Sequence, residues 1–330
     1  MSTRPTAGSG RATDSEAVCG ARPREIGIAV TALSPRAAPS SEPNRPDPRL
    51  GSYSDAPVHV VTPCQDDPVN TIAGIRWVVT GAAGNIGVAL RRELRAAGVE
   101  LVSTDVRDVE AIDGTGDRVT VADLLDLTAL TAMFDGADGV IHLGGLSDEA
   151  DFHDLAEVNV VGTYHVLEAA RRSGVRRVVY ASSNRVTGMY STDTLVDADM
   201  PARPDGFYGV SKVAGEALCR LYSDKFDLST IALRIGSYEQ QPSTPRERAT
   251  WLSHRDAIAA FIAAMTTDEH HAVFYAVSAN SESWWDRTAG ERVGFRPMDD
   301  AADWNIPGDT IEPQGGPFAT PSYSLDRMRD

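Results

Sequence analysis

The chain has 330 residues, 42% of them hydrophobic, which is long enough for a three-layer domain with a sizeable core and a smaller lobe. Its formal net charge of −16 argues against nucleic acid as a partner, because neutralising phosphates requires a basic surface. An anionic substrate would have to meet a local cation, since the long-range field of the protein repels it.

The cysteines and the apolar runs bear on the compartment. Cys19, Cys64 and Cys219 form neither a metal-binding spacing nor a disulfide framework, so we expect a protein of the cytoplasm. The longest apolar run near the N-terminus, residues 26–33, is far shorter than the roughly 20 residues that cross a bilayer, so we expect no membrane association. The histidines lack ligand spacing with cysteines or paired acids, and we expect no metal site.

The chain divides into an irregular and a periodic part. Residues 1–70 hold 10 of the 19 prolines and lack periodicity, so we expect a disordered N-terminal extension. From Ile75 onwards, short apolar runs alternate with amphipathic stretches, which predicts a Rossmann-like, doubly wound α/β domain over 71–237. We expect residues 238–330 to form a small substrate-binding lobe and a C-terminal segment, interleaved with the first domain.

Six apolar runs are candidates for the strands of the parallel sheet. In chain order they are 76–80, 100–104, 118–122, 139–143, 177–181 and 230–234. Helices are expected between them, including 88–97 and 154–172. A further helix should begin near Ser253, which with Asp256 resembles a capping box and precedes an apolar stretch.

A glycine-rich loop, TGAAGNIG at 80–87, joins the first strand to the first helix. Glycines here permit a tight turn, let the backbone approach a pyrophosphate and allow close helix packing, while the helix N-terminus favours negative charge. This context predicts a dinucleotide site. The residues expected to contact NAD are Gly81, Gly84, Asn85, Ile86, Gly87, Asp105, Asp123, Leu124, Leu143, Gly144, Lys212 and Ile235.

Acidic residues at strand ends refine this expectation. Asp105 ends the second strand, where a carboxylate accepts hydrogen bonds from the adenosine ribose and repels a 2′-phosphate, so it favours NAD over NADP. Arg107 lies close enough in sequence to receive such a phosphate, which weakens the preference. Asp123 ends the third strand, where it could meet the adenine amino group or serve as a helix N-cap.

Tyr208 and Lys212 in FYGVSK are four residues apart, so on a helix they face the same side. A free phenol has a pKa of about 10, and a neighbouring ammonium stabilises its ionised form. Ser183 ends the strand VVYASS, where its hydroxyl can hold a reacting oxygen. We therefore expect Tyr208 to be the catalytic base, with Lys212 and Ser183 as its partners.

These motifs together resemble the extended short-chain dehydrogenase/reductase family, the NAD-dependent epimerase/dehydratase group. Several segments are similar to its uronate dehydrogenase branch: IHLGGLS at 141–147, ASSN at 181–184, RPDGFYGVSK at 203–212, RIGS at 234–237, ATWLS at 249–253 and SANSESWWD at 278–286. The resemblance implies NAD-dependent oxidation of the C1 hydroxyl of a hexuronic acid, such as glucuronate or galacturonate, to the aldarolactone.

The resemblance also implies a set of residues for a small anionic sugar. They are Arg246 for the C6 carboxylate, and Ser147, Ser183, Asn184, Tyr208 and Ser237 for hydroxyls. The family pattern continues after ASSN with histidine, whereas this chain has Arg185, which could add a contact to the carboxylate or shift the preferred sugar. Trp284 and Trp285 either line the sugar pocket or pack a lobe interface. Asn159 is expected to satisfy a backbone group.

Two other interpretations compete with a uronate dehydrogenase. A nucleotide-sugar epimerase of the same family would share the fold, NAD and the three catalytic residues, but it needs room for a nucleotide diphosphate, and only 93 residues follow Ser237 in the 330-residue chain. A noncatalytic dinucleotide sensor would be expected to lack Tyr208 or Lys212, and both are present. The tendency of the family toward symmetric assemblies leaves a homo-oligomer open.

Overall fold

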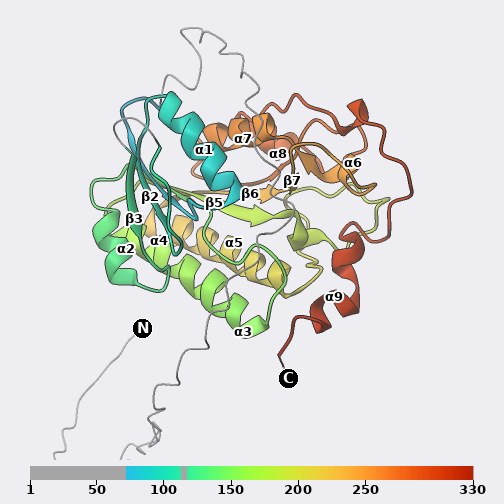
Figure 1. Ribbon diagram of the computed structural model, residues 1–330, viewed down its shortest axis with the longest axis horizontal. Helices are drawn as coiled ribbons and strands as arrows, with labels where there is room; N and C mark the ends of the chain where they lie inside the picture. Colours follow the sequence, from blue (N-terminus) through green and yellow to red (C-terminus); the bar gives the residue numbers. More distant parts are fainter. Residues whose placement is uncertain (1–71, 113–116, 330) are drawn as a thin grey trace, which may run out of the picture. The chain divides into compact units, whose positions relative to one another are not determined.

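The computed structural model describes residues 72–112 and 117–329, so the predicted extension over 1–70 lies outside the described residues. Their centre is a seven-stranded parallel sheet in the order β3-β2-β1-β4-β5-β6-β9 (Figure 1). The strands are β1 (Arg76–Thr80), β2 (Glu100–Asp105), β3 (Asp117–Val121), β4 (Gly139–His142), β5 (Arg177–Ser183), β6 (Ser229–Ile235) and β9 (His271–Ala276). The predicted Rossmann-like, doubly wound α/β fold is confirmed.

Helices cover both faces of the sheet, α1 and α7 on one side and α2, α4 and α5 on the other (Figure 1). The α-helices are α1 (Asn85–Ala96), α2 (Leu127–Met133), α3 (Phe152–Leu155), α4 (Gly162–Arg172), α5 (Phe207–Phe226), α6 (Glu247–Thr250), α7 (His254–Thr266), α8 (Thr288–Val293) and α9 (Pro321–Leu325). No helix within the described ranges is long and apolar enough to cross a membrane.

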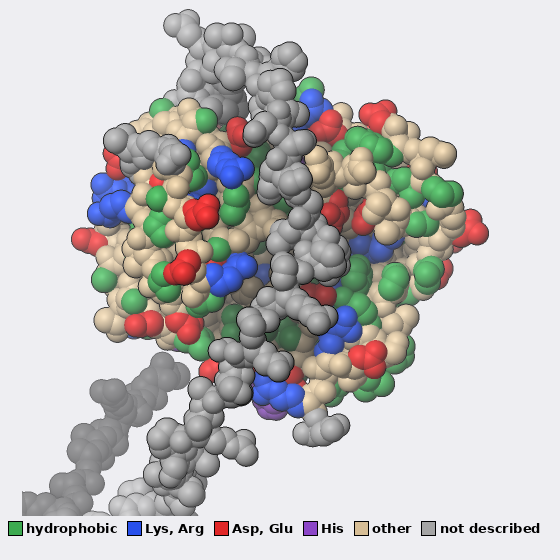
Figure 2. Space-filling view, in the orientation of Figure 1, with side chains coloured by type: hydrophobic (Ala, Val, Ile, Leu, Met, Phe, Trp, Pro, Cys, Tyr) green, Lys and Arg blue, Asp and Glu red, His purple; other side chains and the backbone are tan. Residues whose placement is uncertain are grey.

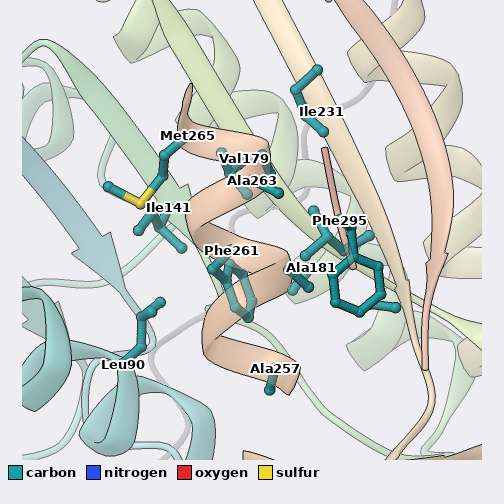
Figure 3. Packing of buried hydrophobic residues seen from close by; sticks show 14 of the residues in the cluster. Leu90, Ile141, Val179, Ala181, Ile231, Ala257, Phe261, Ala263, Met265 and Phe295 are labelled. Carbon is teal, nitrogen blue, oxygen red and sulfur yellow. The ribbon is translucent and has the colours of Figure 1, made fainter. Parts of the chain in front are cut away.

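The central strands are buried on both faces, which is why they are almost continuous apolar runs. Alternate residues of each strand serve the two core layers. Figure 3 shows Phe261 and Met265 of α7 among side chains of the first layer, including Ile141 and Val179. The second layer contains the neighbouring residues of the same strands and the inner faces of α2, α4 and α5. This packing fixes the carboxyl ends of the strands, where the candidate site residues lie.

All six predicted strands are present, with ends that differ by no more than two residues. The seventh, β9, lies beyond residue 237, so the sheet draws one strand from the region predicted as a lobe. The predicted helix 154–172 is divided into α3, a π-helical turn (Ala156–Val161) and α4.

Ser253 caps α7 as predicted, since its Oγ accepts a hydrogen bond from the backbone N–H of Asp256 at 3.0 Å. The reciprocal half of a capping box is absent from this helix. Asp256 instead accepts hydrogen bonds from the N–H groups of Met298 and Asp299, at 2.9 and 3.0 Å. The Asp256 carboxylate therefore anchors a later loop to α7.

The segment between β6 and α7 departs from the alternating pattern. It contains a two-stranded parallel sheet of β7 (Ser237–Tyr238) and β8 (Trp251–Leu252), with α6 between them. Acidic and basic side chains are interspersed over the visible part of the face in Figure 2.

Candidate active site

The glycine loop lies against the end of β4. Gly81 has a φ of +72°, which glycine adopts readily, and a Cβ there would lie 2.6 Å from the backbone nitrogen of Gly144. A Cβ at Gly87 would lie 2.5 Å from the Gly81 carbonyl oxygen. The loop therefore needs glycine at both positions to bring the first turn of α1 close to the sheet.

The N-terminus of α1 has the features that an anion site requires. Gly84 is its N-cap and Asn85 and Ile86 begin its first turn, and among the described residues no side chain caps these N–H groups. Unpaired N–H groups at a helix start favour a phosphate. The loop, with its close backbone approach, thus fits the pyrophosphate of a dinucleotide.

Asp105 lies at the end of β2, beside the loop. Its Oδ2 accepts a hydrogen bond from the N–H of Ala83 at 3.1 Å, and its Oδ1 accepts from the N–H and Nε of Arg107 at 3.1 and 3.2 Å. Burial opposes ionisation, but the hydrogen bonds from Arg107 and Ala83 keep the pKa of Asp105 below its ordinary value. Arg107 is thus paired with the carboxylate that is expected to bind the ribose.

The other predicted cofactor residues also lie at or just after the carboxyl ends of strands. Asp123 follows β3, and its Oδ1 accepts from the N–H of Leu125 at 3.0 Å, whereas Asp126 is the N-cap of α2. Asp123 is therefore not the helix N-cap. Leu124 is buried, and a Cβ at Gly144 would lie 3.0 Å from it. Leu143 follows β4 and Ile235 ends β6, at the carboxyl ends of the strands.

Tyr208, Lys212 and Ser183 are brought together by α5 and β5. All three are buried, and the nearby Ser183 side chain acts to lower the pKa of Tyr208. The Lys212 Nζ lies 5.6 Å from the Tyr208 ring centroid and donates to the carbonyl oxygen of Ala181 at 3.0 Å. Gly209 allows α5 to lie against the turn that follows β5, because a Cβ there would lie 2.6 Å from the carbonyl oxygen of Arg185.

Burial dominates the protonation of this pair. It raises the pKa of Tyr208 to about 12, with the Ser183 hydrogen bond and the Arg185 charge acting in the opposite direction. It lowers the pKa of Lys212 to about 8. At neutral pH the ligand-free protein therefore holds a neutral phenol beside an ammonium group.

Arg246 precedes α6 and is buried. Its Nε donates to the carbonyl oxygen of Gln314 at 2.7 Å, and its Nη1 donates to Ser237 Oγ at 3.3 Å and Thr250 Oγ1 at 3.4 Å. Burial lowers the pKa of Arg246 to about 10, so the side chain stays cationic at neutral pH.

The lack of an acidic partner distinguishes Arg246. Among the described residues, the other buried arginines form ion pairs: Arg91 with Asp117, Arg185 with Asp205, and Arg234 with Glu216. Arg246 alone of these four donates only to neutral oxygens. A buried cation without a carboxylate partner is suited to an anionic ligand.

The remaining predicted substrate residues are placed less uniformly. Ser237 contacts Arg246 and shares a hydrogen bond of 2.8 Å with Thr250. Asn184 is buried and begins the 3₁₀ turn directly after Ser183. Ser147 is exposed on the loop after β4.

Arg185 makes contacts that the sequence did not reveal. Each of its guanidinium nitrogens donates to a different acid: Nε to Asp205, Nη1 to Asp148 and Nη2 to Glu149. In this arrangement it offers no support for the suggested second contact to a substrate carboxylate. A hint lay in the acidic run DEAD at 148–151, but its partner is distant in sequence and could not be identified.

Trp285 packs in the interior, parallel to Tyr275 at a ring separation of 5.0 Å, and Trp284 lies edge-on against it. The packing interpretation therefore holds for Trp285, and Trp284 is half-buried against it. Asn159 satisfies a backbone group as predicted: its Oδ1 accepts from the N–H of Leu146 at 2.7 Å, and its Nδ2 donates to the Leu146 carbonyl oxygen at 3.0 Å.

Comparison with known proteins agrees with this geometry. Residues 77–245 match the model of the NAD-dependent epimerase/dehydratase family. A uronate dehydrogenase of Pseudomonas syringae pv. tomato is 39% identical over 225 residues, covering 68% of this chain and 82% of the relative.

Solved structures give the same result. The glucuronic acid dehydrogenase of Chromohalobacter salexigens is 36% identical with a TM-score of 0.72, covering 76% of this chain and 99% of that one. A mutant uronate dehydrogenase of Agrobacterium tumefaciens complexed with NAD is 36% identical with a TM-score of 0.70, covering 74% and 97%. The cofactor is NAD, as the sequence predicts. The chain therefore belongs to the NAD-dependent epimerase/dehydratase family and is an NAD-dependent oxidoreductase.

Proposed function

We propose that the protein oxidises the C1 hydroxyl of a hexuronic acid, such as galacturonate or glucuronate, to the aldarolactone. The observation that carries the proposal is the buried guanidinium of Arg246, which donates to neutral oxygens, among them Ser237 Oγ, and forms no ion pair within the described residues. A bidentate guanidinium suits a planar carboxylate. The similarity to uronate and glucuronic acid dehydrogenases supports the same substrate class.

The chemistry requires the loss of a hydride from C1 and of a proton from its hydroxyl, so that C1 becomes the lactone carbonyl. NAD, when bound, supplies the hydride acceptor and a positively charged ring. The phenol of Tyr208 must first lose its own proton to solvent, which the Lys212 ammonium and the positive ring of bound NAD would favour by stabilising the phenolate. The Tyr208 phenolate then takes the C1 hydroxyl proton on its Oη. Ser183, whose side chain acts on the pKa of Tyr208, holds the reacting oxygen beside the base.

Arg246 provides the local cation that an acidic protein needs for an anionic sugar. In this proposal it binds the C6 carboxylate at one end of the sugar, and the catalytic three act on C1 at the other. Ser147, Asn184 and Ser237 contact the hydroxyls between these ends.

The experiment is a substrate panel with the purified full chain and NAD, followed by NADH absorbance and by identification of the product. We expect NADH formation with galacturonate or glucuronate and recovery of the aldarolactone. Neutral hexoses serve as the matched control for the C6 carboxylate. Absence of turnover with both uronates, together with conversion of a UDP-hexose to its epimer, would establish the epimerase alternative instead.

A further inference from the structure

Arg185 is a buried cation at the centre of an acidic cluster. It lies in the 3₁₀ turn Asn184–Thr187, directly after Ser183, and its side chain is 7% exposed. Three acids form ion pairs with it. Asp148 and Glu149 lie 3.2 and 3.3 Å from its Nη atoms, and Asp205 pairs with its Nε. Burial opposes the charge, but these acids raise the pKa of Arg185 above its ordinary value.

Two of these acids bind the C-terminal segment, residues 312–325. Tyr323 Oη donates to the Asp148 carboxylate, at 2.7 and 2.8 Å from its two oxygens. Ser324 Oγ donates to Glu149 Oε1 at 2.6 Å. The cluster around Arg185 therefore joins α9 to the loop after β4.

Glu149 extends the same cluster to the catalytic helix. Its carboxylate accepts hydrogen bonds from the N–H groups of Phe207 and Tyr208, at 2.8 and 3.0 Å, at the start of α5. An acid at a helix N-terminus stabilises that end of the helix. Arg185 also lies over the Tyr208 ring, 5.4 Å from its centroid.

Phe318 links Arg185 with Arg246. Its ring centroid lies 4.5 Å from the Arg185 guanidinium carbon and 5.3 Å from that of Arg246. Both distances are in the range of cation–π attraction. The same segment supplies the Gln314 carbonyl oxygen that accepts from Arg246 Nε. Two buried arginines thus contact one ring and one segment of chain.

Gln314 fixes that segment to the rest of the protein. Its side chain is fully buried and its Nε2 donates to the carbonyl oxygens of Ser191 and Thr194, at 3.0 and 2.9 Å. Its own N–H donates to Tyr190, and the N–H of Gly315 donates to Gly188 at 2.7 Å. These two amides report directly on whether the segment is docked.

We infer that Arg185 is a positioning residue, which holds the C-terminal segment in place and, through Phe318, fixes the guanidinium of Arg246. This inference rests on the proposed function, because that function assigns the substrate carboxylate to Arg246. The charge of Arg185 acts against that of Arg246, and the nearby Asp205 offsets part of this repulsion because it attracts both guanidinium groups. In the part of the chain that the structure describes, Arg246 forms no ion pair of its own and so keeps its donors for the ligand. A neutral histidine at position 185 would leave the three acids without a compensating charge.

The test uses Arg185→Gln and Arg185→Lys, with Arg220→Lys as a control, since Arg220 is an exposed arginine of α5 paired with Asp224. We expect Arg185→Gln to speed hydrogen exchange at the Gln314 and Gly315 amides and to raise the KM for uronate about tenfold or more, with the KM for NAD within about twofold. Arg185→Lys should show smaller increases in both the exchange rates and the KM for uronate than Arg185→Gln does. Arg220→Lys should change neither.

A milder variant covers the case in which Arg185→Gln does not fold. Tyr323→Phe keeps the ring and removes its hydrogen bonds to Asp148, so it should speed exchange at the same amides and raise the KM for uronate by a smaller factor. Faster exchange with an unchanged KM would reduce Arg185 to a structural residue and overturn the inference, as would unchanged exchange. If the wild type oxidises no uronate, the proposed function fails, and the exchange rates alone then decide whether Arg185 holds the segment.

Discussion

The ammonium of Lys212 lies 5.6 Å from the ring centroid of Tyr208, one helical turn away on α5, and both side chains are buried. Because the ammonium also donates to the Ala181 carbonyl oxygen, its position is fixed from the strand as well as from the helix. This fixed geometry suits the proton transfer proposed for Tyr208.

Replacing Tyr208 by Phe removes the proposed base and keeps the ring. Turnover should fall by about 10²-fold or more, the contribution typical of general base catalysis, while the affinity for NAD stays close to that of the wild type. NADH absorbance measures the first quantity and a fluorescence titration the second. Tyr164→Phe, at a partly exposed tyrosine of α4, is the control. A Tyr208→Phe enzyme with a near-normal rate would show that another group is the base.

The burial of Lys212 should appear in the pH dependence of stability. Its folded pKa of about 8 lies below its ordinary value of 10.5, so the folded state binds its proton less readily than the unfolded state. The cost of burying the charge is fully present below pH 8 and disappears as the pH rises toward 10.5.

Lys212→Met should therefore have a higher free energy of unfolding than the wild type. The difference should be largest at neutral pH, on the order of 1 to 3 kcal/mol. This gain should shrink between pH 8 and 10.5. Urea unfolding at a series of pH values gives the difference, with the exposed Lys225→Met as the control. A difference that is independent of pH would mean that Lys212 is not shifted by burial.

Arg246→Gln should raise the KM for uronates by about 30-fold or more, the cost of removing one partner of a buried charge pair, and should leave the KM for NAD unchanged. Arg246→Lys keeps the charge without the planar fork and should recover only part of the loss. Arg248→Gln, two residues along the same segment and paired with Glu282, is the matched control. An Arg246→Gln enzyme with a normal KM for uronates would remove the carboxylate-binding role.

Asp105→Ser should shift the cofactor preference toward NADP. The substitution removes the carboxylate that would repel a 2′-phosphate and releases Arg107, which is now paired with it. The ratio of kcat/KM for NAD to that for NADP should fall about tenfold or more, because the repulsion between the carboxylate and the 2′-phosphate is lost. Asp108→Asn, on the following exposed loop, should leave the ratio as it is.

Much of the fold and the positions of the central site residues could be predicted because they depend on local patterns. Buried parallel strands are apolar runs, and residues at their carboxyl ends, such as Asp105 and Ser183, share one edge of the sheet. The strand β9 could not be predicted because its sequence HAVFYA comes after α7, outside the regular alternation, and only its second half is buried.

The Arg185 cluster could not be predicted for a different reason. Its acids and rings come from three segments, among them Glu149, Asp205 and Phe318, which no periodicity connects. Each of them resembles an ordinary surface or loop residue when it is considered alone. Only the three-dimensional arrangement shows that they compensate one buried charge.

The comparison of galacturonate with galactose tests the central claim most directly, because the two sugars differ only in the C6 group that Arg246 is proposed to bind. The measurement is kcat/KM with NAD for both sugars, in the wild type and in Arg246→Gln. We expect a preference for galacturonate of about 100-fold or more in the wild type, which Arg246→Gln largely abolishes. Equal kcat/KM values for the two sugars in the wild type would contradict it.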